Sequence, residues 1–289
     1  MTATSAAKPA AVRRIGFAYN PTIPAAAALS DRAGAWLDQH GIGHWAAPAA
    51  ERATLHQELP SSDVLVVIGG DGTFLRAVQA VIAVDVPILG INLGRIGFLS
   101  KAETDELEAV LEMLQAGAYE VRPRMGLAGA ILPAGRPAVR TFTALNDIVI
   151  ARGSLARVVR LDASIDESHL ATFVADGLVV SSPTGSTGYS FSAGGPILDP
   201  HSRNLVVTPI AGYLSAIRSI VVSPHQVVRC KILDAHEALV SIDGREDHRI
   251  EVGDVVEVRA LEQPIRFVEP SGSMPFWDLL RTKVQLLPS

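Results

Sequence analysis

A glycine-rich turn with a carboxylate at its centre is the segment of this sequence that most clearly points to chemistry. The apolar run VLVVI leads into the turn residues Gly69, Gly70, Asp71, Gly72 and Thr73. A glycine turn between a strand and a helix usually holds a phosphate, because the helix start offers free N–H groups and a partial positive charge. Glycine also lets a ligand approach the backbone closely.

Asp71 is the unexpected residue of this turn, because a carboxylate repels a phosphate. The sequence contains neither the P-loop motif GxxxxGKS/T, whose lysine would offset that charge, nor the dinucleotide fingerprint GxGxxG at this turn. A carboxylate so placed needs a metal, or a proton taken from the phosphate acceptor, and both indicate phosphoryl transfer. The alternative is a tight turn in which Asp71 only caps the helix. The turn alone leaves both interpretations open.

Three later segments carry further candidate binding groups. INLGRIGFLS (91–100) follows another apolar run, and adjacent parallel strands would place this glycine loop beside the first one. Asn146 and Asp147 form a polar pair inside an apolar run, where buried polar groups need partners such as sugar hydroxyls. An ordinary loop explains the first segment equally well, and a bulge or turn explains the second.

The third of these segments spans residues 175–200 and is crowded with Ser, Thr and Gly. Its hydroxyls and backbone groups suit hydrogen bonding to a ligand, and the ring of Tyr189 suits stacking on a base. The alternative is a flexible Ser/Gly linker. Pro183, Phe191 and Pro196 argue against it, because they interrupt the tract with rigid or apolar side chains.

The first 121 residues alternate strand and helix patterns, which predicts a parallel sheet with right-handed crossovers. Strand patterns cover 13–20, 63–70 and 86–94, and helix patterns cover 24–41, 73–84 and 104–117. We expect Thr104 to be the N-cap of the last helix and Gly117 its C-cap. The continuous apolar run at 63–70 is typical of a strand buried on both faces.

Beyond residue 121 the pattern changes to short strand-like runs separated by Gly, Pro, Asp and Ser, which predicts an all-β sandwich. Helical character returns at 275–287. The domain prediction is therefore an α/β domain over 1–121, on which the segment 268–289 packs back, and a β-sandwich domain over 122–267.

Composition limits the function classes. A length of 289 residues suggests two domains. A net charge of −5, with no basic run longer than two residues, argues against nucleic-acid binding. The single cysteine, Cys230, excludes a disulfide framework within the chain and is expected to be a buried thiol. No signal peptide is recognised at the start and no run approaches the roughly 18 apolar residues of a membrane helix, so we expect a cytoplasmic protein without membrane contact.

Taken together, these segments resemble the NAD kinase family. The blocks GGDGTFL (69–75), GINLGRIGFL (90–99), ALNDIVI (144–150) and DGLVVSSPTGSTGYSFSAGGPI (176–197) look like its hallmark motifs in order and spacing. The resemblance covers roughly residues 63–260. GGDGT alone is shared with diacylglycerol, sphingosine and phosphofructo-kinases, whereas its combination with the later blocks is highly specific.

The resemblance implies a phosphoryl transfer from ATP or polyphosphate, with a divalent metal, usually Mg²⁺, to the 2′-hydroxyl of the adenosine ribose of NAD(H). It implies that Asp71 orients or deprotonates this hydroxyl. It assigns the phosphate and ATP contacts to Gly69, Gly70, Gly72 and Thr73. It assigns the NAD contacts to Gly72, Phe98 on the adenine side, Asn146, Asp147 on a ribose, Asp176 near the nicotinamide amide, and the adenine-contacting residues Thr187, Tyr189 and Ser192.

The resemblance also implies a Rossmann-like or phosphofructokinase-like α/β domain joined to a β-sandwich that binds NAD. It implies a homodimer or homotetramer, in which a neighbouring subunit completes the site. The chain departs from the family at Gly188, usually Ala, at Tyr213, usually His, and at Ser219, usually Pro. Two other functions stay open, a lipid or sphingoid kinase that shares GGDGT and a dinucleotide-binding sensor without catalysis.

Overall fold

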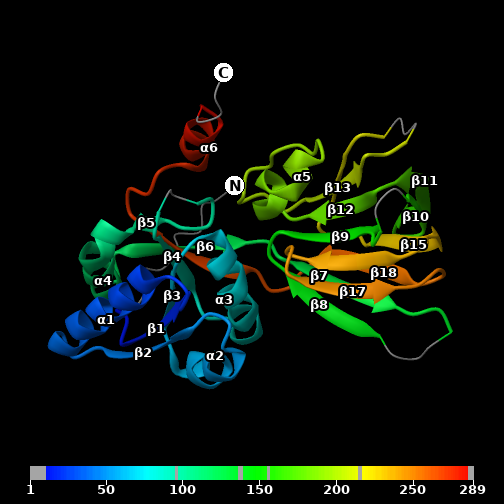
Figure 1. Cartoon of the computed structure of the whole chain (residues 1–289). Coiled ribbons are helices and arrows are strands. Elements are labelled where there is room, and N and C mark those ends of the chain that lie inside the picture. The colour runs from blue at the N-terminus through cyan, green and yellow to red at the C-terminus, as the bar shows by residue number, and fades with distance from the viewer. Residues whose placement is uncertain (1–10, 95–96, 136–138, 155–156, 214–216, 286–289) are drawn as a thin grey trace. The chain divides into compact units, whose positions relative to one another are not determined.

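The computed structural model describes residues 11–94, 97–135, 139–154, 157–213 and 217–285 (Figure 1). The chain divides into two compact units. One, called the α/β unit here, runs to Pro123 and resumes at Ile265, and the other, called the β unit, spans Arg124–Pro264. The segment from Ile265 onward supplies the last strand and the last helix of the α/β unit.

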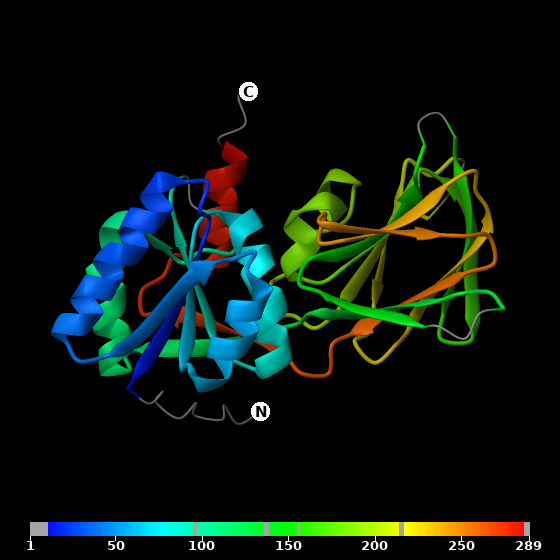
Figure 2. The same ribbon diagram turned by 60° about the horizontal axis from the view of Figure 1, so that its bottom comes forward.

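A mostly parallel sheet forms the centre of the α/β unit. The strand order is β2-β1-β3-β4-β19-β6, and β5 pairs with β4. The strands are β1 (Arg14–Tyr19), β2 (Gly43–Pro48), β3 (Val64–Ile68), β4 (Ile88–Asn92), β5 (Ala102–Glu103), β6 (Tyr119–Arg124) and β19 (Ile265–Pro270). Five strand pairs are parallel: β1 with β2, β1 with β3, β3 with β4, β4 with β5, and β19 with β4. Every residue of β3 and β4 is buried, because helices cover both faces of the sheet (Figure 2).

The helices of this unit are α1 (Pro24–Gln39), α2 (Arg52–Glu58), α3 (Asp71–Val84), α4 (Leu107–Ala116) and α6 (Phe276–Gln285). The predicted N-cap Thr104 is wrong. A 3₁₀ turn, Thr104–Glu106, precedes α4, and Glu103 caps this turn in a reciprocal capping box with Glu106. Gly117 ends α4 in the left-handed conformation, as predicted. Among the described helices, none is long and apolar enough to cross a membrane.

Two six-stranded antiparallel sheets form the β unit. The first has the order β11-β10-β15-β18-β7-β8. Its strands are β7 (Leu127–Leu132), β8 (Arg140–Ala144), β10 (Val159–Ile165), β11 (Ser168–Ala175), β15 (Val228–Asp234) and β18 (Val255–Ala260). The second has the order β14-β13-β12-β9-β16-β17. Its strands are β9 (Asp147–Arg152), β12 (Gly177–Ser181), β13 (Leu205–Ile210), β14 (Ile220–Val222), β16 (Ala238–Ile242) and β17 (Glu246–Ile250).

One apolar core joins the two sheets of the β unit. Leu161, Phe173 and Val256 of the first sheet share it with Ile148 and Leu178 of the second. The predicted fold class, an α/β domain followed by a β-sandwich, is confirmed.

Cys230 belongs to the same core, where burial raises the pKa of its thiol to about 12. A thiol with so high a pKa is inert at neutral pH. The prediction of a buried structural cysteine is therefore confirmed.

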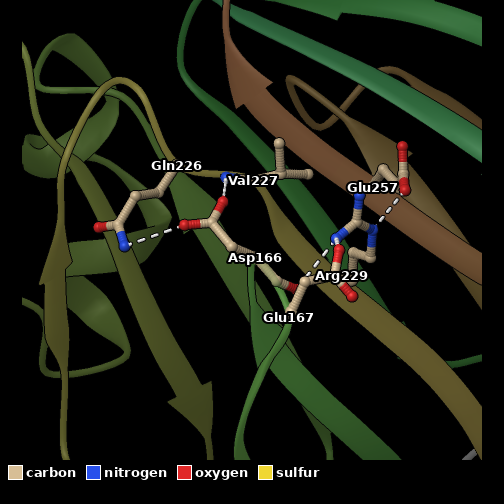
Figure 3. Close-up of polar contacts among 6 residues, drawn as sticks. All are labelled: Asp166, Glu167, Gln226, Val227, Arg229 and Glu257. Atoms are coloured by element: carbon tan, nitrogen blue, oxygen red, sulfur yellow. Dashed lines mark hydrogen bonds and ion pairs between the residues drawn. The ribbon is translucent and has the colours of Figure 1, made fainter.

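The turn between β10 and β11 is tied to the neighbouring strand β15 through Asp166 (Figure 3). The Asp166 carboxylate accepts hydrogen bonds from the backbone N–H of Val227 at 2.9 Å and from Nε2 of Gln226 at 3.2 Å. Arg229 on β15 donates to the Asp166 carbonyl at 2.9 Å and pairs with Glu257 on β18. The bond to Glu257 raises the pKa of Arg229. These contacts hold one end of the first sheet in register.

Candidate active site

Asp71 is the first residue of α3 and follows the glycine turn directly. The N-cap is Gly70, whose carbonyl accepts the N–H groups of Thr73 at 2.9 Å and Phe74 at 3.1 Å. The helix therefore begins two residues earlier than predicted. Its cap does not use the Asp71 side chain, so the interpretation of Asp71 as a plain N-cap is wrong.

The Asp71 carboxylate instead contacts the second glycine loop. Its Oδ2 accepts the backbone N–H of Phe98 at 3.2 Å, and its Oδ1 accepts that of Leu99 at 3.3 Å. A Cβ atom on Gly97 would lie 2.0 Å from Oδ1, so any other residue there would have to displace this carboxylate. Because each carboxylate oxygen has about two acceptor positions, Asp71 can accept further hydrogen bonds while the backbone fixes its orientation.

The two glycine loops come together because β3 and β4 are neighbouring parallel strands. The N–H of Gly69 donates to the carbonyl of Ile91 at 3.0 Å, which joins the ends of the two strands. The carboxyl ends of parallel strands are where open α/β sheets bind ligands. The two glycine loops therefore lie close together, as predicted.

The glycine turn leaves room for a ligand in front of α3. Gly69 has φ +154°, and a Cβ atom there would lie 2.6 Å from Oγ1 of the buried Thr73. At Gly70 or Gly72, an added Cβ atom would meet no atom of the described residues within 4 Å. A helix start with this open approach suits the oxygens of a phosphate.

Phe98 is half-buried and packs against α6. Its ring centroid lies 6.3 Å from that of Phe276, and the Nζ atom of Lys283 lies 5.5 Å from it, within range of a cation–π contact. The C-terminal helix thus contacts the loop whose backbone orients Asp71. Phe98 is therefore not fully buried by this packing.

Asn146 and Asp147 lie at the start of β9. Their backbone N–H groups donate to the carboxylate of Asp243, which directly follows β16. Asp243 has φ +50°. Its side chain accepts the N–H groups of Leu145 at 3.0 Å, Asn146 at 2.7 Å and Asp147 at 3.2 Å. The sequence analysis missed Asp243, although the dipeptide Asp-Gly at the end of the run ALVSI was a visible turn signal.

Asp147 is 6% exposed and titrates in the neutral range. Burial, followed by the charge of Asp243, raises its pKa to about 7. At neutral pH its carboxyl group is therefore partly protonated. It can donate a hydrogen bond as well as accept one, which suits a ribose hydroxyl.

The Ser/Thr/Gly block is ordered structure rather than a linker. It forms a 3₁₀ turn, Thr184–Thr187, followed by the short helix α5 (Tyr189–Ser192). A Cβ atom on Gly185 would lie 2.1 Å from the carbonyl oxygen of Asn146, so this turn packs directly on the polar pair. Thr187 is half-buried, whereas Tyr189 is 48% exposed and presents its ring to solvent.

Gly188 and Ser192 complete the description of this block. A Cβ atom on Gly188 would lie 4.0 Å from Oδ2 of Asp147 and 3.3 Å from the carbonyl oxygen of Gly185. The glycine at position 188, where the resemblance predicts alanine, therefore leaves extra space beside Asp147. Ser192 ends α5 and is exposed.

Asp176 lies at the opposite end of the β9–β12 pair from Asp147. The register pairs Gly177 with Ala151 at one end and Ser181 with Asp147 at the other. Four steps of about 3.3 Å separate the two ends, or roughly 13 Å. The structure thus brings Asn146, Asp147 and the Thr187 block together but leaves Asp176 apart from them.

The Asp176 carboxylate is held by a residue that the sequence analysis did not single out. Arg152 donates to it from Nε at 2.7 Å and from Nη2 at 3.2 Å. This fork-to-fork geometry fixes the carboxylate strongly. A ligand amide near Asp176 would therefore meet a carboxylate that is already oriented.

Tyr213 and Ser219, where the resemblance predicts His and Pro, lie in the segment after β13. Tyr213 is 71% exposed, and its backbone N–H donates to Val174 at 2.8 Å. The Ser219 hydroxyl is 3.1 Å from that of the buried Thr208, which in turn is 3.5 Å from the hydroxyl of Ser190 on α5. Ser219 thus joins a chain of hydroxyl groups behind α5, where proline could form no such bond.

Comparisons with known proteins agree on one family. The model of the ATP-NAD kinase N-terminal domain matches residues 17–119, and that of the ATP-NAD kinase C-terminal domain matches residues 145–270. The NAD kinase of Dehalococcoides mccartyi strain BAV1 is 35% identical over 273 residues, which cover 94% of this chain and 96% of that protein. The NAD kinase of Moorella thermoacetica is 40% identical over 237 residues, which cover 81% of this chain and 75% of that protein.

Two solved structures share the fold. The NAD kinase of Archaeoglobus fulgidus in complex with ATP superposes with a TM-score of 0.73 at 25% identity, over 95% of this chain and all of that one. Yeast NADH kinase complexed with NADH superposes with a TM-score of 0.82 at 24% identity, over 96% of this chain and 88% of that one. At that identity, the second comparison concerns the fold alone.

Proposed function

The chain belongs to the NAD kinase family, and we propose that Asp71 is the general base of its phosphoryl transfer. As an NAD(+) kinase, it transfers a phosphoryl group from ATP to the 2′-hydroxyl of the adenosine ribose of NAD(H), which yields ADP and NADP(H). One observation carries the role of Asp71. Its carboxylate is oriented by two backbone N–H groups at the mouth of a glycine turn and keeps free acceptor positions for a hydroxyl proton.

In the reaction, the bond between the 2′-oxygen and the transferred phosphorus forms while the bond from that phosphorus to ADP breaks. The hydroxyl proton passes to Asp71. Because the transition state is largely dissociative, positioning and charge neutralisation contribute most. The donor phosphates are assigned to the turn residues Gly69, Gly70, Gly72 and Thr73 at the start of α3, where the helix dipole favours an anion.

A divalent metal, for which we take Mg²⁺, would supply charge neutralisation to the donor phosphates when bound. Among the described residues, no group of three or more His, Cys, Asp or Glu side chains could hold a metal by itself. Mg²⁺ commonly keeps several waters and binds through one or two carboxylates plus substrate phosphates. The turn has one carboxylate, Asp71, so such a metal would be held mainly by the substrate phosphates and by water, and Asp71 keeps its role as the base. Inorganic polyphosphate stays a predicted alternative donor.

For the dinucleotide, we assign Asn146 and Asp147 to the ribose hydroxyls, and Thr187, Tyr189 and Ser192 to the adenine. The assignment is supported by the packing of the Gly185 turn on Asn146 and by the open ring of Tyr189. The neutral-range pKa of Asp147 supports a hydrogen bond in either direction. Gly72 and Phe98 stay predicted contacts on the side of the glycine turn.

Asp176 is assigned to the nicotinamide amide, oriented by Arg152. Its distance along β12 from the Asn146–Asp147 pair is compatible with a site that a neighbouring subunit completes, so we propose a homodimer or homotetramer. Light scattering coupled to gel filtration measures that state. The cytoplasmic location stays a prediction for cell fractionation to test.

The decisive experiment incubates the purified protein with NAD or NADH, Mg²⁺, and ATP or polyphosphate, and measures NADP(H). Formation of NADP(H) that is lost in Asp71→Asn supports the proposal. Binding of NAD without any turnover would instead favour a dinucleotide sensor. Phosphorylation of a lipid in place of NAD would favour the other GGDGT kinases, although the match to the C-terminal domain of ATP-NAD kinases speaks against them.

A further inference from the structure

Asn92 is a buried polar residue without a hydrogen-bond partner for its amide nitrogen. It is the last residue of β4 and only 5% exposed. Its Nδ2 atom has no hydrogen-bond partner among the described residues. Buried polar groups in folded proteins are nearly always paired, so an unpaired donor at the end of a strand needs an explanation.

Asn92 lies on the face of the sheet that α3 covers. Side chains alternate between faces along a strand, so Gly90 and Asn92 share a face. A Cβ atom on Gly90 would lie 3.1 Å from the ring of Phe74 in α3, which identifies that face. Asn92 is two residues closer to the carboxyl end of β4, where the Gly69 N–H joins the strand ends through the Ile91 carbonyl.

This position places a buried amide beside the glycine turn and the start of α3. The Nδ2 of Asn92 adds a hydrogen-bond donor at this end of the sheet, near the positive end of the α3 dipole and beside Asp71, whose carboxylate offers only acceptors. A donor at a helix start favours an anion, because the helix dipole adds to its attraction. A neutral amide also supplies a donor at any pH without a charge that would need a partner in the absence of phosphate.

We propose that Asn92 donates a hydrogen bond from Nδ2 to a phosphate oxygen of the ATP substrate. The assignment rests on the proposed function, which places the donor phosphates at the glycine turn. It makes Asn92 a substrate-binding residue that takes part of the role of the absent P-loop lysine. The buried, unpaired donor is retained because ATP supplies its acceptor.

Ser100 provides a matched control from the same face of the sheet. It is 1% exposed, and its Oγ atom also has no partner among the described residues. Its Cα lies 2.9 Å from the position of a Cβ atom on Gly90, so it lies level with Gly90, two residues of β4 further from the turn than Asn92. If unpaired burial were only a defect of packing, the two residues would respond alike to removal of their polar atoms.

The test compares Asn92→Leu, Asn92→Asp and Ser100→Ala with the wild-type chain. Asn92→Leu is expected to raise the melting temperature, because an unpaired buried donor is removed, and to raise the KM for ATP about tenfold or more while the KM for NAD is unchanged. Asn92→Asp keeps the shape but sets a carboxylate against the phosphate, so a larger loss of ATP affinity is expected. Ser100→Ala is expected to leave both KM values at the wild-type level.

Calorimetric titration of each protein with Mg²⁺-ATP in the absence of NAD separates this inference from the proposed function. A wild-type chain that binds ATP but forms no NADP would contradict the function and leave the Asn92 comparison intact. Wild-type ATP affinity in both Asn92 variants would overturn the inference and leave the function standing. An equal loss of ATP affinity in folded Ser100→Ala would also overturn it, because packing would then be the cause.

Discussion

A Cβ atom on Gly97 would lie 2.0 Å from Oδ1 of Asp71, well inside the sum of their van der Waals radii. The glycine is therefore required by the carboxylate and not by a turn, because its φ is not in the left-handed region. The next two residues, Phe98 and Leu99, donate their N–H groups to the same carboxylate. The second glycine loop thus acts as a backbone cradle for the proposed base.

Gly97→Ala is expected to lower kcat although Asp71 itself is unchanged. The added methyl group must displace the carboxylate, and a shift of about 1 Å in a catalytic group can cost roughly 10²-fold in rate. Gly94→Ala in the same loop is the matched control, because a Cβ atom there would meet no described atom within 4 Å. Steady-state kinetics of both variants checks this. Equal rates would show that the cradle does not set the position of Asp71.

Asp71→Asn is expected to lower kcat by at least about 10²-fold, the usual lower limit for loss of a general base. NAD binding should persist, since most of the proposed dinucleotide contacts, from Asn146 to Ser192, belong to the β unit. The asparagine amide cannot accept both backbone N–H groups that the carboxylate accepts now, so a small loss of stability is also expected. Stopped-time assays and NAD titration measure the two effects, and near-normal turnover would exclude Asp71 as the base.

The sequence predicts this α/β unit best where a strand is buried on both faces. A strand between two helical layers needs apolar residues on both sides, so the continuous apolar run 63–70 predicts a buried strand. The structure has β3, Val64–Ile68, within this run. β2 and α2 were not predicted. β2, GHWAAP, begins with glycine and ends with proline, and α2 has only seven residues, too few for a clear helical period.

Sequence patterns could not predict the contacts that orient the side chains of the candidate site. Asp243 and Asn146 are 97 residues apart, and their hydrogen bond depends on the pairing of β9 with β16. The proximity of the two glycine loops followed from adjacent parallel strands, whereas the cradle around Asp71 depends on one missing Cβ atom at Gly97. Periodicity predicts which face a side chain occupies, but not which distant backbone groups it contacts.

Asp147 is expected to make stability depend on pH near neutrality. Its pKa is about 7 in the folded chain against an ordinary value of 3.8, so the folded state keeps a proton that the unfolded state releases between these values. The free energy of unfolding therefore falls as the pH rises from about 4 to about 7. Asp147→Asn cannot titrate and should be more stable than the wild-type chain at about pH 8.

Urea unfolding at about pH 5 and about pH 8 measures this difference for the wild-type chain and for Asp147→Asn. Asp234→Asn, at the exposed end of β15, is the matched control and should follow the wild-type curve. A wild-type stability that is flat over this range would contradict the raised pKa of Asp147.

Tyr189→Ala is expected to raise the KM for NAD, with little change in kcat or in the melting temperature. Tyr189 is 48% exposed, so the fold depends little on it, whereas stacking of aromatic groups contributes about 0.5–1.5 kcal/mol, or roughly 2- to 10-fold in affinity. Phe191→Ala is the matched control, because Phe191 lies on the same short helix and is 49% exposed. Two residues along a helix turn the side chain through about 200°, so both rings cannot stack on one adenine. A rise in KM confined to Tyr189→Ala supports the stacking, and an unchanged KM in that variant rejects it.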